Sequence, residues 1–228
     1  MTSESTLENS QKLNPETQQG LIKLAANGDK QAREQLIRDI TPLIYRHARR
    51  LLRNDQDARD ASQDTIVKIL ANLHRYDSHW RFTTWVLRIC RNTCIDEFRR
   101  RKRQRPVDLN NTAEIADSRP GPAERTTIQR QRIRLHKALD TLAPLYKEVI
   151  VLYHFEHLQY NEIAEVLGAP IGTIMNRIFR ARKKLREAYV KLHVGSADGA
   201  EQASATVGWN LFEQLGRDQL PTQAWATR

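Results

Sequence analysis

Cysteine is scarce in this sequence, since Cys90 and Cys94 are the only two among 228 residues. One pair of cysteines cannot supply the several disulfides that stabilise small secreted domains. No second pair of Cys or His at metal-ligand spacing accompanies them, so the sequence predicts no metal site. The two thiols could form a redox sensor, but buried cysteine commonly acts as a small hydrophobic residue, and we expect both to pack along one helix.

Long apolar runs are also absent. No uninterrupted hydrophobic stretch approaches the roughly 20 residues that a helix needs to cross a bilayer. The amino terminus, MTSESTLENSQKLNPE, is polar and has no hydrophobic signal core. The sequence therefore predicts a cytoplasmic protein that does not insert into a membrane.

The residue patterns of catalytic sites are missing as well. The sequence offers no nucleophile with a neighbouring base, no carboxylates at metal spacing and no glycine-rich phosphate loop. His154 and His157 stand near a helix end without carboxylate companions, and we interpret both as structural or solvent-facing. We expect no cofactor and no enzymatic activity, and a nucleic-acid-processing enzyme is the weakest function considered.

Positive charge is what the sequence has in excess. Lys and Arg number 37 against 27 Asp and Glu, which gives a formal net charge of +10. Such a balance favours an anionic partner, either nucleic acid or an anionic surface, and charge alone does not choose between them.

The hydrophobic pattern is helical along most of the chain, and no alternation of period two is long enough to indicate a sheet. The sequence therefore predicts an all-α protein. In the first part we expect four helices, at about residues 15–26, 29–52, 55–73 and 83–102. Pro42 lies inside the second of these and is expected to kink or split it.

The helical pattern disappears between Arg105 and Ala123, where Pro, Gly, Asn and Ser leave little apolar surface to bury. We interpret this segment as a flexible linker between two helical domains, and two further helices follow it at about 128–142 and 145–155. The expected divisions are a flexible tail at 1–19, a first domain at 20–105, the linker at 106–122 and a second domain at 123–192. The last division, at 193–228, is an extension that is disordered or regulatory.

A helix-turn-helix pattern occupies residues 160–186, and Gly168 supplies the permissive backbone of its turn. The second helix begins near Gly172. Its inward stripe is Ile174, Ile178, Ala181 and Leu185, and its outward stripe is Thr173, Asn176, Arg177, Arg180 and Lys184. The outward stripe combines residue types that read base edges with types that bind phosphate, as expected of a helix that enters a DNA groove.

Basic residues crowd this second helix, where only Glu187 lies near to balance them: Arg177, Arg180, Arg182, Lys183, Lys184 and Arg186. Their mutual repulsion is unfavourable without an anionic partner. A basic amphipathic helix can also be a merely solvated surface, but the net charge of the chain favours the DNA-binding interpretation.

An acidic patch opens the third expected helix, formed by Asp55, Asp57, Asp60 and Asp64 around Gln63. The helix macrodipole favours Asp55 and Asp57 near the amino terminus, but it does not account for the three residues further along. They could form a plain solvated face. We favour the alternative, that the patch docks against a basic partner helix.

Aromatic and basic residues alternate in the segment 76–91, YDSHWRFTTWVLRICR. Trp85 is in register with Ile89 and is expected in the core. The others are expected on or beside a loop: Tyr76, Trp80 and Phe82, next to Arg75, Arg81 and Arg88. Aromatic faces flanked by cations suit unpaired nucleotides. The basic run 99–105 that follows is expected to lie on phosphates, the alternative being a solvated helix end.

Taken together, these motifs resemble those of a bacterial RNA polymerase sigma factor of the extracytoplasmic-function (ECF) group. DARDASQDTI at 57–66 resembles the core-polymerase-binding helix of that family, and FTTWVLRICRNTCIDEFRRRKR at 82–103 resembles its minus-10 element. Residues 142–186 resemble its minus-35 domain. The resemblance covers about residues 20–192.

The resemblance implies a role for each motif. Core-polymerase binding falls to Asp57, Asp60, Gln63 and Asp64. Capture of the melted minus-10 strand falls to Arg75, Tyr76, Trp80, Arg81, Phe82, Arg88, Asn92, Asp96 and Arg99. Contact with the minus-35 duplex falls to Thr173, Asn176, Arg177, Arg180, Lys183 and Lys184. The implied partners are core RNA polymerase, promoter DNA as duplex and as melted strand, and an anti-sigma factor.

Two positions depart from the family pattern. Pro170 stands where Ser or Thr more often caps the recognition helix, and Ile66 stands where an aromatic is common. The alternative function is an autonomous helix-turn-helix regulator that binds duplex DNA as a dimer, but it leaves the acidic patch and the aromatic loop unexplained.

Overall fold

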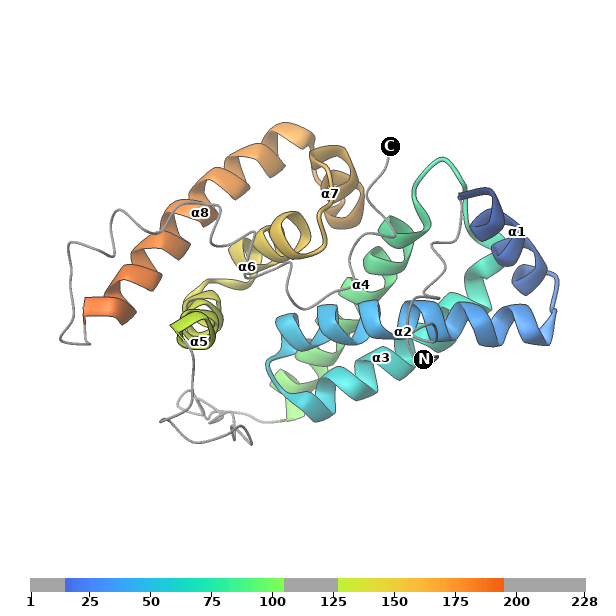
Figure 1. The fold of residues 1–228 in the computed structure, drawn as a ribbon, viewed down its shortest axis with the longest axis horizontal. Coiled ribbons are helices and arrows are strands. Elements are labelled where there is room, and N and C mark those ends of the chain that lie inside the picture. The colour runs from blue at the N-terminus through green and yellow to red at the C-terminus, as the bar shows by residue number, and fades with distance from the viewer. Residues whose placement is uncertain (1–14, 105–126, 195–228) are drawn as a thin grey trace, which may run out of the picture.

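The computed structural model describes residues 15–104 and 127–194, and every regular element in these ranges is helical (Figure 1). The first range contains α1 (Pro15–Ala26), α2 (Lys30–Leu52), α3 (Asp55–Asn72), the 3₁₀ turn η1 (Leu73–Arg75) and α4 (Phe82–Gln104). The second contains α5 (Thr127–Thr141), α6 (Pro144–Ile150), the π-helical turn η3 (Val151–Phe155), α7 (Tyr160–Leu167) and α8 (Ile171–Val194). The prediction of an all-α chain with two helical units is confirmed. The expected linker at 106–122 and the extension after Val194 lie outside the described residues.

Helices α2 and α3 begin at side-chain caps. Asp29 Oδ1 accepts the Ala32 N–H at 2.7 Å, and Asn54 Oδ1 accepts the Asp57 N–H at 3.1 Å. Each cap satisfies an amide that has no partner within its own helix. Pro42 lies inside α2, and the helix continues through it to Leu52, so of the two expected outcomes, a kink or a split, the split is excluded. The backbone hydrogen bond that Pro42 cannot donate is outweighed by the burial of an apolar stripe that extends before and after Pro42 in the helix. Its members are Ala32, Leu36, Ile40, Ile44 and Ala48.

Helices α1 to α4 enclose one apolar core, which also holds the two cysteines. Cys90 and Cys94 are buried, and the Cys90 thiol donates to the Ile44 carbonyl across a distance of 3.7 Å. The neighbouring Cys94 side chain and burial raise the pKa of Cys90 well above its usual range. A thiol that stays protonated is a poor nucleophile, so the expected packing role is the one that the structure supports.

In the second unit, α7 and α8 form the helix-turn-helix. A capping box opens α7, because the Gln159 side chain accepts from the backbone of Glu162 and Glu162 Oε2 accepts the Gln159 N–H at 2.9 Å. Gly168 closes α7 with φ of 60°, a left-handed conformation that glycine adopts without strain. The predicted inward stripe of α8 is confirmed, since Ile174, Ile178, Ala181 and Leu185 are all buried.

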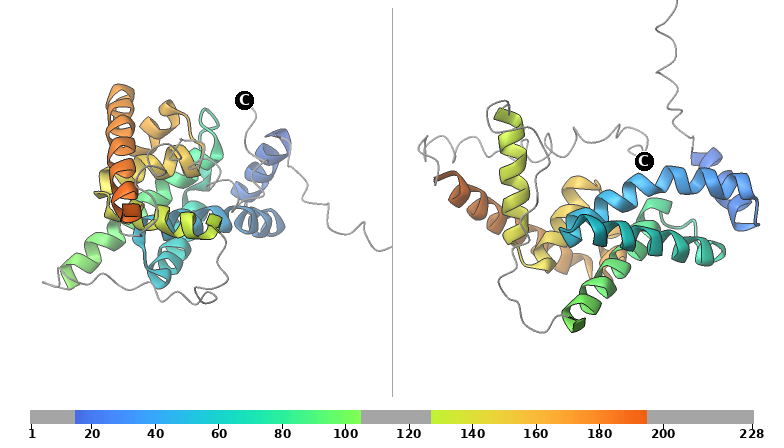
Figure 2. Two further views of the ribbon diagram at one scale, coloured as in Figure 1. Left: turned by 60° about the vertical axis from the view of Figure 1, so that its left-hand side comes forward. Right: turned by 90° about the horizontal axis from the view of Figure 1, so that it is seen from below.

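The two helical units pack directly on each other through α4 and α7, with α6 against α2 (Figures 1 and 2). Leu87 of α4 is buried in the apolar cluster of the second unit, and Leu43 of α2 packs against both clusters. The sequence predicted two domains, and it contained no local signal for this close contact between them.

Candidate nucleic-acid interface

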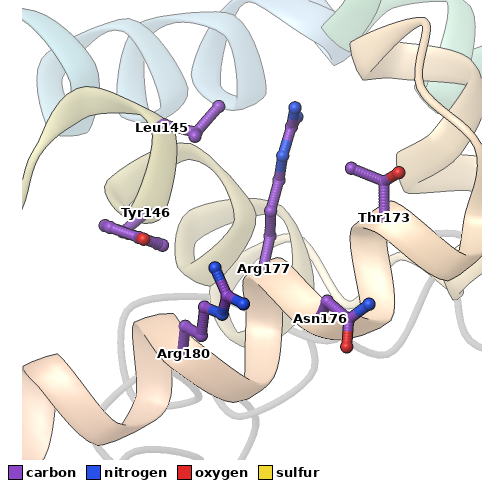
Figure 3. A pocket seen from close by; sticks show the side chains of 6 residues that line it. All are labelled: Leu145, Tyr146, Thr173, Asn176, Arg177 and Arg180. Atoms are coloured by element: carbon purple, nitrogen blue, oxygen red, sulfur yellow. The ribbon is translucent and has the colours of Figure 1, made fainter.

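The outer side of α8 carries the residues predicted to meet a DNA duplex. Asn176, Arg180, Lys183 and Lys184 are exposed, whereas Thr173 and Arg177 are half-buried. A hollow of about 260 Å³ lies beside them between α6 and α8, lined by Leu145, Tyr146, Thr173, Asn176, Arg177 and Arg180 (Figure 3). The structure therefore brings the predicted minus-35 residues together on one side of a single helix.

Within this group the side chains point in different directions. Arg177 extends from α8 toward the start of α6 near Leu145, whereas Asn176 points away from α6 (Figure 3). The Lys184 Nζ lies 5.6 Å from the centre of the Tyr146 ring, which holds that ammonium beside the hollow. Asn176 therefore faces away from α6, whereas Arg177 and Lys184 lie toward it.

Apolar side chains on the same helix were missed by the sequence analysis. Ile171, Met175 and Phe179 recur every fourth residue of α8, and Phe179 is 73% exposed. The sequence did contain a signal for their position. The buried stripe of α8 is complete without these three residues, so they had to lie on the exposed part of the helix. An exposed apolar side chain on a helix that enters the major groove can contact the methyl group of thymine.

The acidic patch on α3 is smaller than predicted. Asp57 is only 3% exposed and is ion-paired with Arg101 of α4, so the prediction that it belongs to an exposed docking surface is not supported by its position. Burial raises the pKa of Asp57 in spite of the Arg101 charge. Asp60 is half-buried and accepts from Gln56, and Gln63 and Asp64 are exposed.

One residue extends this patch. Val67 lies one helical turn beyond Gln63 and Asp64 on α3, and it is 67% exposed. A patch with an apolar member and a polar rim suits protein contact better than a uniformly charged face does. Val67 was not predicted from the sequence, although its four-residue spacing from Gln63 places it on the same side of α3.

The aromatic segment before α4 divides into core and surface. Phe82 is buried, and its ring lies edge-on to Tyr76 with 5.1 Å between ring centres. Trp85 packs against both rings, as the prediction of a core Trp85 requires. The prediction that Phe82 belongs to a strand-binding loop does not fit its position, because Phe82 begins α4 and points into the core.

Trp80 remains the aromatic residue of the loop that is outside the core cluster. Its carbonyl accepts the Tyr76 hydroxyl at 2.7 Å, and its ring lies edge-on to His79 at 5.3 Å between ring centres. Arg75, Asn92 and Arg99 are exposed on the same unit. Tyr76 thus positions the loop, and Trp80 is a half-buried aromatic side chain that lies outside the core cluster.

The remaining residues predicted for strand capture are held by ion pairs. Asp96 lies 3.9 Å from the Lys68 ammonium on α3. Arg81 lies 3.7 Å from Glu162 of α7, and Arg88 pairs with Glu165 of α7. The last two pairs cross from the first unit to the second.

The two pairs between the units belong to a larger set. In this set the first unit contributes the basic side chains and the second unit contributes the carboxylates. Its members are His47 and Arg50 with Glu156, Arg53 with Asp140, Arg81 with Glu162, Arg88 with Glu165, and Arg91 with Glu148. In addition, the Thr84 hydroxyl donates to Glu162 Oε1 at 2.9 Å in a buried position. None of these carboxylates was identified as a partner from the sequence.

Glu156 forms the most buried of these contacts. Its side chain is 2% exposed, and its Oε1 lies 3.2 Å from His47 Nδ1 and 3.0 Å from Arg50 Nη1. Burial alone would raise the pKa of Glu156, but the His47 hydrogen bond and the charges of Arg50 and Arg46 outweigh it, and the pKa is lowered. Glu156 is therefore an anion that holds two parts of the chain together.

Two features are absent from the residues that the structure describes. Within the described ranges no three His, Cys, Asp or Glu side chains are grouped so as to hold a metal ion. In the same ranges, none of the helices has the length and apolar character required to span a bilayer.

Comparison with known families assigns both units. A family model described as Sigma-70 region 2 matches residues 36–104, and one described as Sigma-70, region 4 matches residues 132–185. The first match contains the acidic patch and α4, and the second contains the helix-turn-helix. Together they cover more than half of the chain.

The chain is similar to several named sigma factors. It is 34% identical to the ECF RNA polymerase sigma factor SigE of Mycolicibacterium smegmatis, over 78% of this chain and 69% of the relative. It is 31% identical to the RNA polymerase sigma-H factor of Pseudomonas aeruginosa, over 77% and 95% of the two chains, and 28% identical to SigW of Bacillus subtilis, over 73% and 93%.

Two solved structures are similar across both helical units. CnrH in complex with the cytosolic domain of CnrY has a TM-score of 0.57 at 26% identity, covering 78% of this chain and 99% of that chain. The sigma factor RpoE in complex with the anti-sigma factor NepR from Bartonella quintana has a TM-score of 0.54 at 25% identity, covering 68% and 94%. The two matched regions, their order along the chain and these relatives show that the chain belongs to the ECF group of RNA polymerase sigma factors.

Proposed function

We propose that this sigma factor divides promoter recognition among three surfaces: α3 holds core RNA polymerase, the loop before α4 together with α4 holds the melted minus-10 strand, and α8 reads the minus-35 duplex. The observation that carries the proposal is the presence, on one chain, of a basic duplex-reading helix, an aromatic loop and an acidic patch. The chain itself carries out no covalent chemistry, because the polymerase is the catalyst. Core polymerase and promoter DNA as partners support a cytoplasmic location.

The docking surface for polymerase consists of Asp60, Gln63, Asp64 and Val67 on α3. Their accessibility and their mixture of negative charge with one apolar side chain support contact with a basic helix of the partner. Asp57 has a different role, because its ion pair with Arg101 fixes α4 against α3.

The minus-10 surface uses Trp80 as the stacking residue and the exposed Arg75, Asn92 and Arg99 as polar contacts. Stacking of one base on an aromatic side chain contributes roughly 1–3 kcal/mol in single-strand binders. Binding energy of this size stabilises an unstacked base, so DNA opening is driven by binding and needs no nucleotide hydrolysis.

The minus-35 surface reads base edges through Asn176 and Arg180, with Thr173 beside them. Lys183, Lys184 and Arg177 contact phosphates and set the register of α8 in the groove. An anti-sigma factor is a further proposed partner, because one of the two similar structures is a complex of a sigma factor with an anti-sigma factor.

A pull-down with purified core polymerase tests the docking surface. The wild-type chain is expected to bind, and replacement of Asp60 by Arg together with Gln63 by Ala is expected to abolish binding. The matched control is Glu34→Arg with Gln31→Ala, which makes the same changes at exposed positions of α2. Equal binding by both double variants would overturn the assignment of α3.

Transcription initiation tests the function as a whole. Core polymerase with the wild-type chain is expected to initiate at new start sites, which can be mapped after overexpression. Tight and specific binding of an operator without polymerase, by a dimeric chain, would favour the autonomous regulator instead.

A further inference from the structure

Three apolar side chains form a row along the exposed part of α8. Ile171, Met175 and Phe179 recur every fourth residue and are 50%, 52% and 73% exposed. Side chains four positions apart lie on one side of a helix, so these three make a continuous surface, the apolar stripe of α8. Within residues 15–104 and 127–194 the stripe stays exposed. A contiguous apolar surface of this kind indicates a contact site, whereas single scattered apolar residues do not.

The margin of the apolar stripe is basic, which restricts what can cover it. Arg180 follows Phe179 directly, and Lys183 and Arg186 lie about one and two turns beyond it, all three exposed. A second copy of α8 would bring like charges against these side chains, which is unfavourable. The stripe therefore suits a partner that has an apolar side and carries acidic rather than basic charge.

The chain contains such a segment after α8, at residues 207–215, which lie outside the described residues. Its sequence is VGWNLFEQL, and at helical spacing the large apolar residues fall on one side: Trp209, Leu211, Phe212 and Leu215. The polar residues among them fall on the other side. The sequence after Val194 has four acidic residues and two arginines, whereas the whole chain has a formal net charge of +10. The segment thus has both properties that the stripe requires.

The dimensions of the segment and of its connection to α8 agree with those of the stripe. Segment 207–215 and the stripe at 171–179 both span nine residues, about 12 Å along a helix. Phe179 lies roughly 22 Å back along α8 from Val194, where the helix ends. The intervening residues 195–206 can extend to about 40 Å, so the segment can return to Phe179 and run antiparallel to α8. A tether of this length also makes a weak contact effective, because both partners belong to one molecule.

We propose that residues 207–215 pack as a short helix on the apolar stripe of α8, with Trp209 near Phe179. The duplex-reading residues Asn176 and Arg180 directly follow two members of the stripe, so the docked segment and promoter DNA exclude each other. This second consequence relies on the minus-35 role proposed above for α8. The apparent affinity for the duplex is then reduced by the fraction of molecules in which the segment is docked.

Methyl NMR of the full chain tests the docking. The chain contains two methionines, Met1 and Met175, so labelling with [¹³C-methyl]methionine gives one signal from the stripe and one from the amino terminus. The Met175 methyl group is expected to show nuclear Overhauser contacts with indole protons of Trp209. Trp209→Ala is expected to shift the Met175 signal and to leave the Met1 signal in place. The matched control is Trp225→Ala, which removes the same side chain further along the chain and is expected to shift neither signal.

Duplex binding tests the consequence for promoter recognition. The probe is a fluorescein-labelled duplex with the minus-35 region of a mapped start site. Trp209→Ala is expected to bind it about threefold more tightly than the wild type does, because the docked fraction falls. Trp225→Ala is expected to bind as the wild type does. Saturating duplex should move the Met175 signal of the wild type away from its docked position.

Three results would overturn the proposal. The first is a Met175 signal that Trp209→Ala leaves unchanged or that Trp225→Ala shifts equally. The second is a Met175 signal that moves as the protein is diluted, since it would assign the stripe to a second copy of the chain. The third is a docked segment whose removal does not increase affinity for the duplex. The NMR comparison needs neither DNA nor polymerase, so it decides the docking even if the chain fails to direct polymerase, a result that would refute the proposed function separately.

Discussion

Arg50 Nη1 lies 3.0 Å from Glu156 Oε1, although 106 positions separate the two residues in the chain. The Arg50 guanidinium also lies over the Phe155 ring, 4.7 Å from its centre. The same Glu156 Oε1 also lies 3.2 Å from His47 Nδ1. Removal of this one carboxylate would leave buried positive charge on α2 without its anion.

We therefore expect Glu156→Gln to loosen the two units and to lower the thermal unfolding midpoint. Loss of one partner of a buried ion pair destabilises by about 3–5 kcal/mol, because the other charge stays buried. Calorimetry and scattering measure the two effects, and Glu34→Gln at an exposed position of α2 is the control. A midpoint equal to that of the control would show that Glu156 adds nothing to stability.

The same carboxylate predicts how the stability of the folded chain responds to acid. The pKa of Glu156 is lowered from its ordinary value of 4.5, so the folded chain binds this proton more weakly than the unfolded chain does. Its contribution is complete above about pH 4.5 and is lost as the pH falls through the lowered pKa. The thermal unfolding midpoint of the wild type should therefore fall in this acidic window, with a smaller change for Glu156→Gln.

His154 provides a separate pH test within the second unit. Burial, followed by the nearby charges of Arg182 and His157, lowers the pKa of His154 to about 4. The neutral ring accepts from Arg182 Nε at 3.3 Å, which protonation of that nitrogen would prevent. The unfolded chain therefore binds a proton first, and up to about 3 kcal/mol of stability is lost as the pH falls from about 6.5 toward 4. NMR titration of the ring should give a midpoint near 4, and a midpoint near 6.5 would contradict its burial.

Trp80→Ala is expected to impair promoter opening and to leave polymerase binding intact. The loss of stacking is worth roughly 1–3 kcal/mol and should vanish on a template whose minus-10 region is already melted. Trp80→Phe, which keeps an aromatic face, should restore most of the activity. If the premelted template gives no relief, Trp80 supports the fold of the loop instead.

Arg180→Ala is expected to weaken initiation selectively at promoters with one particular base pair, because a base-edge contact carries roughly 1–3 kcal/mol of discrimination. Lys183→Ala should weaken all promoters alike and reduce the salt dependence of binding by about one ion. Transcription from promoters varied one base pair at a time in the minus-35 region separates the two patterns. A uniform loss for Arg180→Ala would make it a phosphate contact.

Phe179 can be tested with the DNA rather than with the protein alone. Replacement of single thymines by deoxyuridine in the minus-35 region removes one methyl group at a time. At the thymine that touches Phe179 the wild type should lose about fourfold in affinity, the value of one buried methyl group. Phe179→Ala should bind both versions of the DNA equally. Sensitivity of Phe179→Ala at that same position would place the methyl contact on another residue.

Sequence reasoning succeeded wherever the information was local. The buried stripe of α8 follows from three- and four-residue spacing, and the end of α7 follows from the left-handed conformation that Gly168 allows. The caps at Asp29 and Asn54 begin their helices through equally local contacts.

The errors involve contacts between distant positions. Asp57 carries the same charge as Asp64, and only the approach of Arg101, 44 positions later, draws it inward. The sequence places Phe82 among the aromatic residues of the loop, and only its contacts with the Tyr76 and Trp85 rings show that it belongs to the core. Glu162 and Glu165 read as ordinary polar residues of a helix, because their partners on α4 lie 77 or more positions earlier. The spacing of hydrophobic residues indicates which side of a helix is buried. It does not indicate which distant residues contact the polar side.

Leu43 packs against the apolar clusters of both units, and Leu87 of α4 lies inside the cluster of the second. Heat should therefore melt the chain in a single cooperative transition as long as the units stay together. When the two units are separated, each unit must rely on its own smaller core, and the calorimetric trace should separate into two peaks.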